Sequence, residues 1–253
     1  MQRLSGRTCL ISGASSGLGE RFSRLAANAG ANVVLAARRK ERVAALAAEI
    51  RDAGRKALAI AMDVTDEPSV IAAYDAAAAE FGPVDTVIAN AGVSAPGRSI
   101  DISVESLRSL FDTNVLGVFL TAREGARRLI AAGSRETGVG RILLIGSMGA
   151  IAPIAGEAAY CTSKAAVAWL GRNLAREWAR QGINVNVIQP GFILTEMAGD
   201  WFASEGGKAQ IAGFPRRALQ PIESLDEQIL YLCSDASKQI TGATFTIDDG
   251  QSL

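Results

Sequence analysis

The sequence predicts an α/β protein, a doubly wound three-layer sandwich in which helices cover both faces of a seven-stranded parallel sheet. Segments that read as strands and as helices alternate along the chain, which is typical of this class. Several strand candidates are apolar at successive positions, such as Val33-Val34-Leu35 and Ile142-Leu143-Leu144-Ile145, as strands buried on both faces are. The chain of 253 residues, 49% of them hydrophobic, can bury one large core, so we predict a single domain over residues 1–253.

The expected elements begin with a strand, and strands and helices then alternate. The first strand is an apolar run from Thr8 to Ser12, and the helix after it carries an apolar stripe at Phe22, Leu25 and Ala26. Further strands are expected near residues 32–37, 56–61, 84–89, 141–147, 183–189 and 243–247. Helices are expected near residues 17–29, 39–53, 67–81, 103–132 (broken near 111), 158–181 and 224–234. In such a fold, ligands bind at the carboxyl ends of the strands.

A glycine-rich turn separates the first strand from the first helix. It has the spacing Gly-x-x-x-Gly-x-Gly and consists of Gly13, Ala14, Ser15, Ser16, Gly17, Leu18 and Gly19. A turn of this kind presents backbone N–H groups and a helix N-terminus to phosphate, and glycines let a pyrophosphate approach closely. The Gly-x-x-x-x-Gly-Lys pattern of a mononucleotide P-loop is missing. The alternative interpretation is an ordinary strand-to-helix connection that is rich in small residues.

Tyr160 and Lys164 lie four positions apart in a segment that reads as the start of a helix. Both side chains therefore project from one helix face, with Cβ atoms roughly 5–6 Å apart. An ammonium group near a phenol favours the phenolate, so we expect the pKa of Tyr160 to fall from about 10 towards neutrality, which suits a general acid or base. The alternative is a surface tyrosine beside a solvated lysine. Because the chain has no histidine, His-based triads and most zinc sites are excluded, and we expect no metal site.

Six short motifs occur in order along the chain. They are Ser12 to Gly19, Ala89-Asn90-Ala91-Gly92, Asn114, Ser147, Tyr160-x-x-x-Lys164 and Pro190-Gly191. In this combination the whole chain resembles the short-chain dehydrogenase/reductase family in its single-domain form, and more narrowly the 3-oxoacyl reductases. The interval of 13 residues from Ser147 to Tyr160 is the one that the family uses. Ser12 replaces the family's usual threonine and keeps the hydroxyl, whereas Ala89 replaces an asparagine.

The resemblance implies a Rossmann-like fold and roles for four catalytic residues. Ser147 would hydrogen-bond and orient the substrate oxygen, and Tyr160 would give a proton to the carbonyl oxygen or remove it in the oxidative direction. Lys164 would lower the pKa of Tyr160 and hold the nicotinamide ribose. Asn114 would hold a water molecule that links Lys164 to solvent. Simpler interpretations are a strand-end hydroxyl for Ser147 and a polar residue inside a helix for Asn114.

The end of the second expected strand indicates which nicotinamide cofactor binds. An NAD site usually has an acidic residue there for the ribose 2′-OH, but this chain has Ala37 followed by Arg38 and Arg39. Guanidinium groups bind phosphate, so we predict that NADP(H) is preferred through Arg38 and that NAD(H) remains possible. The alternative is a solvated charge cluster at a helix start. Further cofactor contacts that the resemblance implies come from Asp63, Val64, Asn90, Ala91, Gly92, Tyr160, Lys164, Pro190, Gly191, Ile193 and Thr195.

The substrate is predicted from a segment near residues 195–215 that carries large apolar side chains and two adjacent glycines. We expect a lid over an apolar pocket; packing on the core or on a partner chain is the alternative. The substrate residues would be Ser147, Met148, Ile154, Tyr160, Met197 and Trp201. We therefore predict a reductase for neutral, largely apolar ketones, or a dehydrogenase for the corresponding secondary alcohols. A 3-oxoacyl thioester reductase, with Arg216 and Arg217 near an acidic carrier, and a non-catalytic nucleotide sensor are the alternatives.

The amino-acid composition limits which classes of partner and which cellular compartment are expected. Lys and Arg together number 26, as do Asp and Glu, so electrostatics favour neither nucleic acid nor an anionic membrane. Three cysteines without metal-ligand spacing and the lack of an apolar N-terminal signal segment predict a cytoplasmic protein. The family resemblance implies a homotetramer that uses the helices near 112–132 and 158–181 and the C-terminal segment. Asp248-Asp249-Gly250 departs from the family's usual Asp-Gly-Gly at that second contact.

Overall fold

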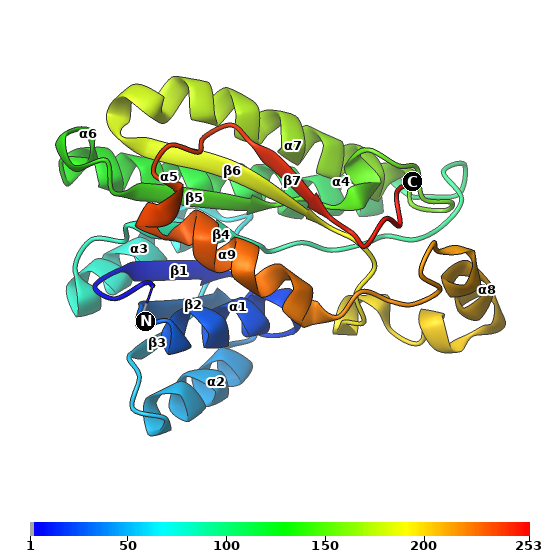
Figure 1. Cartoon of the computed structure of the whole chain (residues 1–253), viewed down its shortest axis with the longest axis horizontal. Coiled ribbons are helices and arrows are strands. Elements are labelled where there is room, and N and C mark those ends of the chain that lie inside the picture. Colours follow the sequence, from blue (N-terminus) through cyan, green and yellow to red (C-terminus); the bar gives the residue numbers. More distant parts are fainter. Residues whose placement is uncertain (1–2) are drawn as a thin grey trace.

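The computed structural model describes residues 3–253, and its centre is a seven-stranded sheet in which every pairing is parallel (Figure 1). The strand order is β3-β2-β1-β4-β5-β6-β7, which confirms the predicted fold class. The strands are β1 (Thr8–Ser12), β2 (Asn32–Ala37), β3 (Ala57–Ala61), β4 (Thr86–Ala89), β5 (Gly140–Ile145), β6 (Ile183–Pro190) and β7 (Thr244–Ile247).

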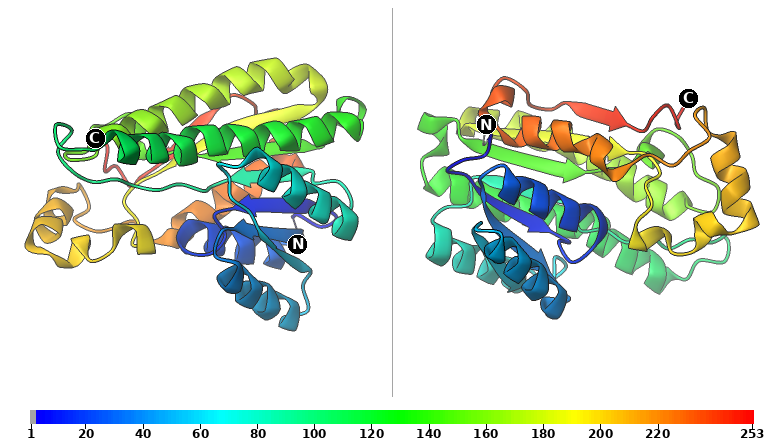
Figure 2. Two further views of the ribbon diagram at one scale, coloured as in Figure 1. Left: turned by 180° about the vertical axis from the view of Figure 1, so that it is seen from behind. Right: turned by 60° about the horizontal axis from the view of Figure 1, so that its bottom comes forward.

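Helices cover both faces of this sheet and give it two separate cores. The helices are α1 (Gly17–Asn28), α2 (Lys40–Asp52), α3 (Glu67–Phe81), α4 (Val104–Phe111), α5 (Gly117–Ala131), α6 (Ser134–Thr137), α7 (Ala158–Trp178), α8 (Glu205–Gly213) and α9 (Asp226–Cys233). Helices α1, α2 and α9 contribute to one core, and α3, α5 and α7 to the other. Figure 1 shows α1 and α9 on the near face, and Figure 2 shows α3 and α5 on the opposite face.

Successive residues of one strand belong to different cores, which explains the unbroken apolar runs. Val33 and Leu35 of β2 lie in the core with α1, whereas Val34 lies in the core with α3. All three side chains are fully buried. A strand that packs against helices on both faces has no polar side, as the sequence pattern indicates.

The strand order reverses between β1 and β4. From β1 the chain proceeds outward to β2 and β3, and from β4 it proceeds in the other direction to β7. Neighbouring loops at the carboxyl ends of β1 and β4 therefore leave on opposite faces, which opens the crevice where ligands bind in such sheets. The glycine-rich turn follows β1, and Asn90 to Gly92 follow β4, so both motifs lie at this crevice.

Two helical segments depart from the regular pattern. The long helix expected over 103–132 breaks after 111, as predicted, into α4, a π-helical turn (Asp112–Leu116) and α5. The segment at 195–215 contains helix α8 and two short 3₁₀ turns, which the sequence pattern did not predict. Figures 1 and 2 show α8 beyond the carboxyl ends of the strands, apart from the layered helices. Over residues 3–253, no helix has both the length and the apolar character that a membrane crossing needs.

Candidate active site

The glycine-rich turn is held tightly against the turn that follows β4. The Ser12 hydroxyl accepts hydrogen bonds from the backbone N–H groups of Asn90 (3.0 Å) and Ala91 (3.1 Å). The Asn90 side-chain amide donates to the Ser12 carbonyl at 3.0 Å. A Cβ atom added to Gly19 would lie 2.2 Å from the Gly13 carbonyl oxygen, so only glycine fits there. The hydroxyl at position 12 thus joins the two loops, as the serine-for-threonine replacement implied.

Helix α1 begins at Gly17 with backbone groups available to a ligand. Its N-cap residue, Ser16, makes no side-chain capping hydrogen bond. Gly17 has a φ of +56° and Gly13 a φ of +69°, backbone conformations that favour glycine. These features fit a dinucleotide pyrophosphate, because free N–H groups at a helix N-terminus bind anions.

Lys164 and Tyr160 project from the first turns of α7 towards the end of β5. The Lys164 ammonium donates to the Ile145 carbonyl at 2.9 Å and lies 5.7 Å from the centre of the Tyr160 ring. Ser147 follows β5 and is buried, its hydroxyl accepts from the Gly149 N–H at 3.0 Å, and it lies near enough to Tyr160 to oppose the rise in the pKa of that phenol. The structure therefore brings Ser147, Tyr160 and Lys164 together as predicted.

Asn114 lies on the π-helical turn between α4 and α5 and is completely buried. Its side-chain oxygen accepts from the Val93 N–H at 2.8 Å, and its amide group donates to the Val93 carbonyl at 2.9 Å and to the Ser163 hydroxyl at 3.0 Å. A Cβ atom added to Gly92 would lie 3.4 Å from both the Asn114 oxygen and the Lys164 nitrogen. Asn114 thus ties the loop after β4 to α7 beside Lys164.

The protonation of this cluster differs from the expectation. Burial raises the pKa of Tyr160 to about 12, and hydrogen bonding to Ser147 only partly opposes this. The expected fall towards neutrality was wrong for the protein alone, because burial disfavours the phenolate and the Glu157 carboxylate adds to that effect. Burial also lowers the pKa of Lys164 from 10.5 to about 8. A cation brought by a cofactor would favour the phenolate.

The stability of the cofactor-free protein is expected to rise between about pH 8 and pH 10.5 through Lys164. In that range the unfolded chain still binds the lysine proton while the folded protein has released it, so raising the pH favours folding. The full effect is on the order of 3 kcal/mol. Lys164→Met should lack this component, which denaturant unfolding of both proteins at several pH values would measure. Parallel pH profiles would contradict the shifted pKa.

A sequence model described as short chain dehydrogenase matches residues 7–206. The chain belongs to the short-chain dehydrogenase/reductase family. It is 35% identical over 245 residues to cis-4-hydroxycyclohexanecarboxylate dehydrogenase of Sinomonas cyclohexanicum, with 96% of each chain covered. This family member is thus an NAD(P)-dependent oxidoreductase that acts on CH–OH groups.

Two solved structures of the family resemble this dehydrogenase closely. The first is a gluconate 5-dehydrogenase from Burkholderia cenocepacia J2315 in complex with NADP and tartrate, with a TM-score of 0.92, 31% identity and coverage of 99% of this chain and 96% of that one. The second is a 3-ketoacyl-(acyl-carrier-protein) reductase from Brucella melitensis complexed with NADH, with a TM-score of 0.89, 32% identity and coverage of 99% and 100%. Relatives therefore bind either nicotinamide cofactor.

The loop after β6 in this dehydrogenase is fixed by two glutamines that sequence reasoning missed. The Gly191 N–H donates to the Gln220 side chain at 3.1 Å, and the Phe192 N–H donates to the Gln251 side chain at 2.6 Å. Ile193 pairs with Gln220 in an isolated parallel bridge. Pro190 ends β6, and Thr195 lies opposite the glycine-rich turn, 3.4 Å from where a Gly17 Cβ would be. Glutamine amides in loops carry no motif that would have indicated this.

Asp63 and Arg38 lie near each other after the carboxyl ends of β3 and β2. Asp63 accepts at one carboxylate oxygen from the Thr65 N–H (2.9 Å) and the Thr65 hydroxyl (2.8 Å), and these bonds, with a smaller effect of Arg38, lower its pKa. Arg38 is exposed, and the neighbouring Val64 is buried. Asp63 thus acts as a turn residue here, with Thr65 bonded to only one of its two carboxylate oxygens.

Only some of the predicted substrate residues lie close to Ser147 and Tyr160. Met148 is buried beside Ser147, and Ile154 is half-buried. Met197 and Trp201 are about half exposed, and the Trp201 indole donates to Gln210 within the same segment at 2.7 Å. Phe192 stacks on Phe214 and contacts Phe202 edge to face. The segment at 195–215 is therefore a small lobe with its own aromatic packing, attached at Phe192.

Proposed function

We propose that the protein reduces neutral, largely apolar ketones with NADPH, or oxidises the corresponding secondary alcohols with NADP. The observation that carries the cofactor preference is at the end of β2, where Ala37 stands in the place of a ribose-binding acid and arginines follow. Arg39 donates to the hydroxyls of Ser15 (3.0 Å) and Ser16 (2.6 Å) in the glycine-rich turn. Guanidinium groups around these serines suit a 2′-phosphate.

The catalytic residues act on the proton and the substrate oxygen. The bound cofactor supplies or accepts the hydride. In the reductive direction the Tyr160 O–H bond breaks as its proton passes to the carbonyl oxygen, while Ser147 donates a hydrogen bond to the same oxygen. Lys164 lies against the Tyr160 ring and next to Asn114. We propose that it restores the Tyr160 proton and holds the nicotinamide ribose.

The groups near Tyr160 favour a substrate without a carboxylate. Glu157 precedes Tyr160 by one helical turn, accepts from the Ser94 hydroxyl at 2.8 Å, and adds a negative field that helps raise the pKa of Tyr160. Burial raises the pKa of Glu157 itself. In the loop after Ser147, Ile154 is half-buried and lies against Gly149, and Met148 is buried. An anionic wall beside apolar surface disfavours keto acids, and a lobe at 195–215 would cover the remaining opening.

A thioester substrate is the second candidate, supported by the likeness to the 3-ketoacyl-(acyl-carrier-protein) reductase. Arg216 and Arg217 would have to meet an acidic carrier, but Arg216 already pairs with Asp249 at 2.8 Å. We also propose a homotetramer in the cytoplasm. The exposed Trp169 and Leu116 on α7 and the π-helical turn support an interface on that side.

A panel of substrates and both cofactors tests the proposal. NADPH should give a kcat/KM at least about ten-fold above that of NADH, since a charge-assisted hydrogen bond is worth about 1.5–3 kcal/mol. Ala37→Asp combined with Arg38→Ala should reverse the preference, by repelling a 2′-phosphate and accepting from a 2′-OH. Equal kcat/KM for the two cofactors in the unmodified protein would contradict the cofactor proposal.

The same panel tests the substrate class. Aryl-alkyl and cyclic ketones should exceed small keto acids in kcat/KM, measured by the absorbance of the reduced nicotinamide. Better turnover of keto acids or free sugars would contradict the proposal of an apolar substrate pocket. No turnover of any ketone, alcohol or 3-oxoacyl thioester, with cofactor still bound, would favour the sensor alternative.

A further inference from the structure

Glu196 forms a contact that the catalytic roles do not explain. It follows Thr195 at the start of the lobe at 195–215. Its two carboxylate oxygens accept from Arg39 at 3.1 Å each and from Arg42 at 2.9 and 2.8 Å. Hydrogen bonding to Ser16 and to both arginines lowers the pKa of Glu196, so the carboxylate is ionised at neutral pH.

The same arginines belong to the adenosine end of the cofactor crevice. Arg39 is the N-cap residue of α2, and its guanidinium reaches Ser15 and Ser16 as well as Glu196. A 2′-phosphate beside Ser15 would need the donors that the Glu196 carboxylate now occupies. Both are oxyanions that bind guanidinium in the same way. The 2′-phosphate therefore either displaces the Glu196 carboxylate from the guanidinium groups or shares these groups with it. In the second case the two negative charges repel each other.

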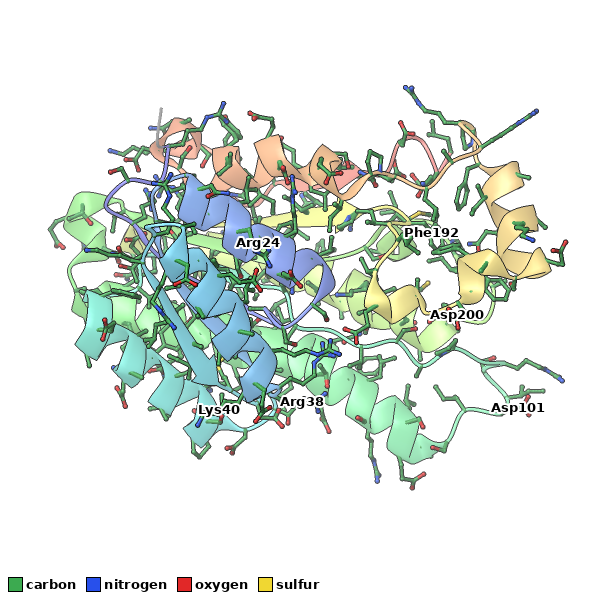
Figure 3. The ribbon with its side chains drawn as sticks, turned by 90° about the horizontal axis from the view of Figure 1, so that it is seen from below. Arg24, Arg38, Lys40, Asp101, Phe192 and Asp200 are labelled. Carbon is green, nitrogen blue, oxygen red and sulfur yellow. The ribbon has the colours of Figure 1, made fainter. Side chains whose placement is uncertain are left out.

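The contact joins parts of the chain that are far apart in sequence. Arg39 and Glu196 are separated by 157 positions, and the contact spans from the β2–α2 connection to the lobe after β6. Figure 3 shows Arg38 and Lys40 on the side of the blue helices, and Phe192 and Asp200 on the side of the yellow and orange lobe. Among the ion pairs of residues 3–253, only those of Glu196 connect the lobe's first turn to the β2–α2 connection.

We propose that Glu196 is a specificity-determining residue whose carboxylate occupies the arginines that would receive a 2′-phosphate. NADP(H) must displace this carboxylate or share its guanidinium donors with it, whereas NAD(H) can bind with the ion pairs intact. Displacement also breaks the contact between the first turn of the lobe and the cofactor site. Binding of a 2′-phosphate therefore favours a detached lobe, and a detached lobe in turn favours binding of a 2′-phosphate. The inference rests on the proposed location of the 2′-phosphate but not on which cofactor the protein prefers.

The side chains involved allow exchange. Their exposed fractions are 44% for Arg39, 51% for Arg42 and 49% for Glu196. Ion pairs that are this open to water are weak and are screened by salt. A dianionic phosphate can therefore replace the carboxylate, and Glu196 reduces the affinity for it only several-fold.

Calorimetric binding of two cofactor fragments tests the proposal without turnover. The probes are adenosine 2′,5′-bisphosphate, which carries the 2′-phosphate, and adenosine 5′-phosphate, which lacks it. Glu196→Gln should bind the bisphosphate about five-fold more tightly at low salt and change the affinity for the monophosphate less than about two-fold. Glu205→Gln is the matched control, because Glu205 lies in the same lobe and, among residues 3–253, forms an ion pair with Lys208 alone, at 2.8 Å, so it should leave both affinities unchanged.

A second variant tests whether the gain in bisphosphate affinity depends on the arginines that Glu196 contacts. In an Arg42→Gln background, Glu196→Gln should give a smaller gain for the bisphosphate, because one of the two contested guanidinium groups is gone. Unchanged or weaker bisphosphate binding in Glu196→Gln would overturn the proposal, as would an equal gain for the monophosphate. A preference of the unmodified protein for NADH would instead refute the proposed cofactor and leave this comparison of fragments intact.

Discussion

Tyr160→Phe is expected to lower kcat by about a thousand-fold while the Kd for the cofactor stays within about two-fold, because only the transferable proton is removed. The ring itself, which packs over the Lys164 ammonium, remains. Turnover is measured by the absorbance of the reduced nicotinamide, and cofactor binding by calorimetry on the same preparation.

Tyr74→Phe is the matched control for the loss of a buried hydroxyl. The Tyr74 hydroxyl donates to the Thr121 carbonyl at 2.8 Å in the core with α3 and α5, away from the crevice. Its loss should lower the free energy of unfolding by about 1 kcal/mol and leave kcat unchanged. If Tyr160→Phe kept appreciable activity, then another group would transfer the proton and the assigned mechanism would fail.

Gly19→Ala is expected to weaken cofactor binding by roughly 100-fold and to lower the free energy of unfolding by about 1–3 kcal/mol. The added methyl group would lie 2.2 Å from the Gly13 carbonyl oxygen and 2.7 Å from the Asn90 amide nitrogen. The first of these atoms is backbone, so the glycine-rich turn itself has to move. The Kd for NADPH and a denaturant unfolding curve measure the two effects.

Gly213→Ala provides the comparison, because no atom of the described part of the chain beyond its immediate neighbours lies within 4 Å of the position of its added Cβ. It should leave both the Kd and the unfolding curve nearly unchanged. A Gly19→Ala protein that binds NADPH normally would mean that the turn can shift without affecting the pyrophosphate site.

The sheet and its covering helices could be predicted from the sequence because their signal is local. Apolar residues at successive positions, as in Val33-Val34-Leu35, require a strand between two helical layers, and the observed strand lies between two cores. The proximity of Ser147, Tyr160 and Lys164 could also be predicted. The four-residue spacing of Tyr160 and Lys164 places them on one helix face, and the interval from Ser147 to Tyr160 matches the family. The helix α8 was missed because the 195–215 segment has glycines and no clear period.

Properties that depend on contacts across the crevice could not be predicted in the same way. Gln220 and Gln251 hold the loop after β6, and neither lies near that loop in sequence. The pKa of Tyr160 was predicted to fall but is raised, because the spacing places Lys164 near the phenol but does not show how deeply the phenol is buried.

The sequence by itself determined the α/β class, the parallel sheet and the glycine-rich turn, since these signals lie in short stretches of the chain, and its motifs indicated the candidate catalytic side chains. Only the tertiary structure decided which arginine reaches Ser15 and which carboxylate meets it. Arg38 and Arg39 are indistinguishable as a sequence pair, and Glu196 is 157 positions from Arg39. Electrostatic and burial energies depend on distances in space, and the folding of the two halves around the crevice sets those distances.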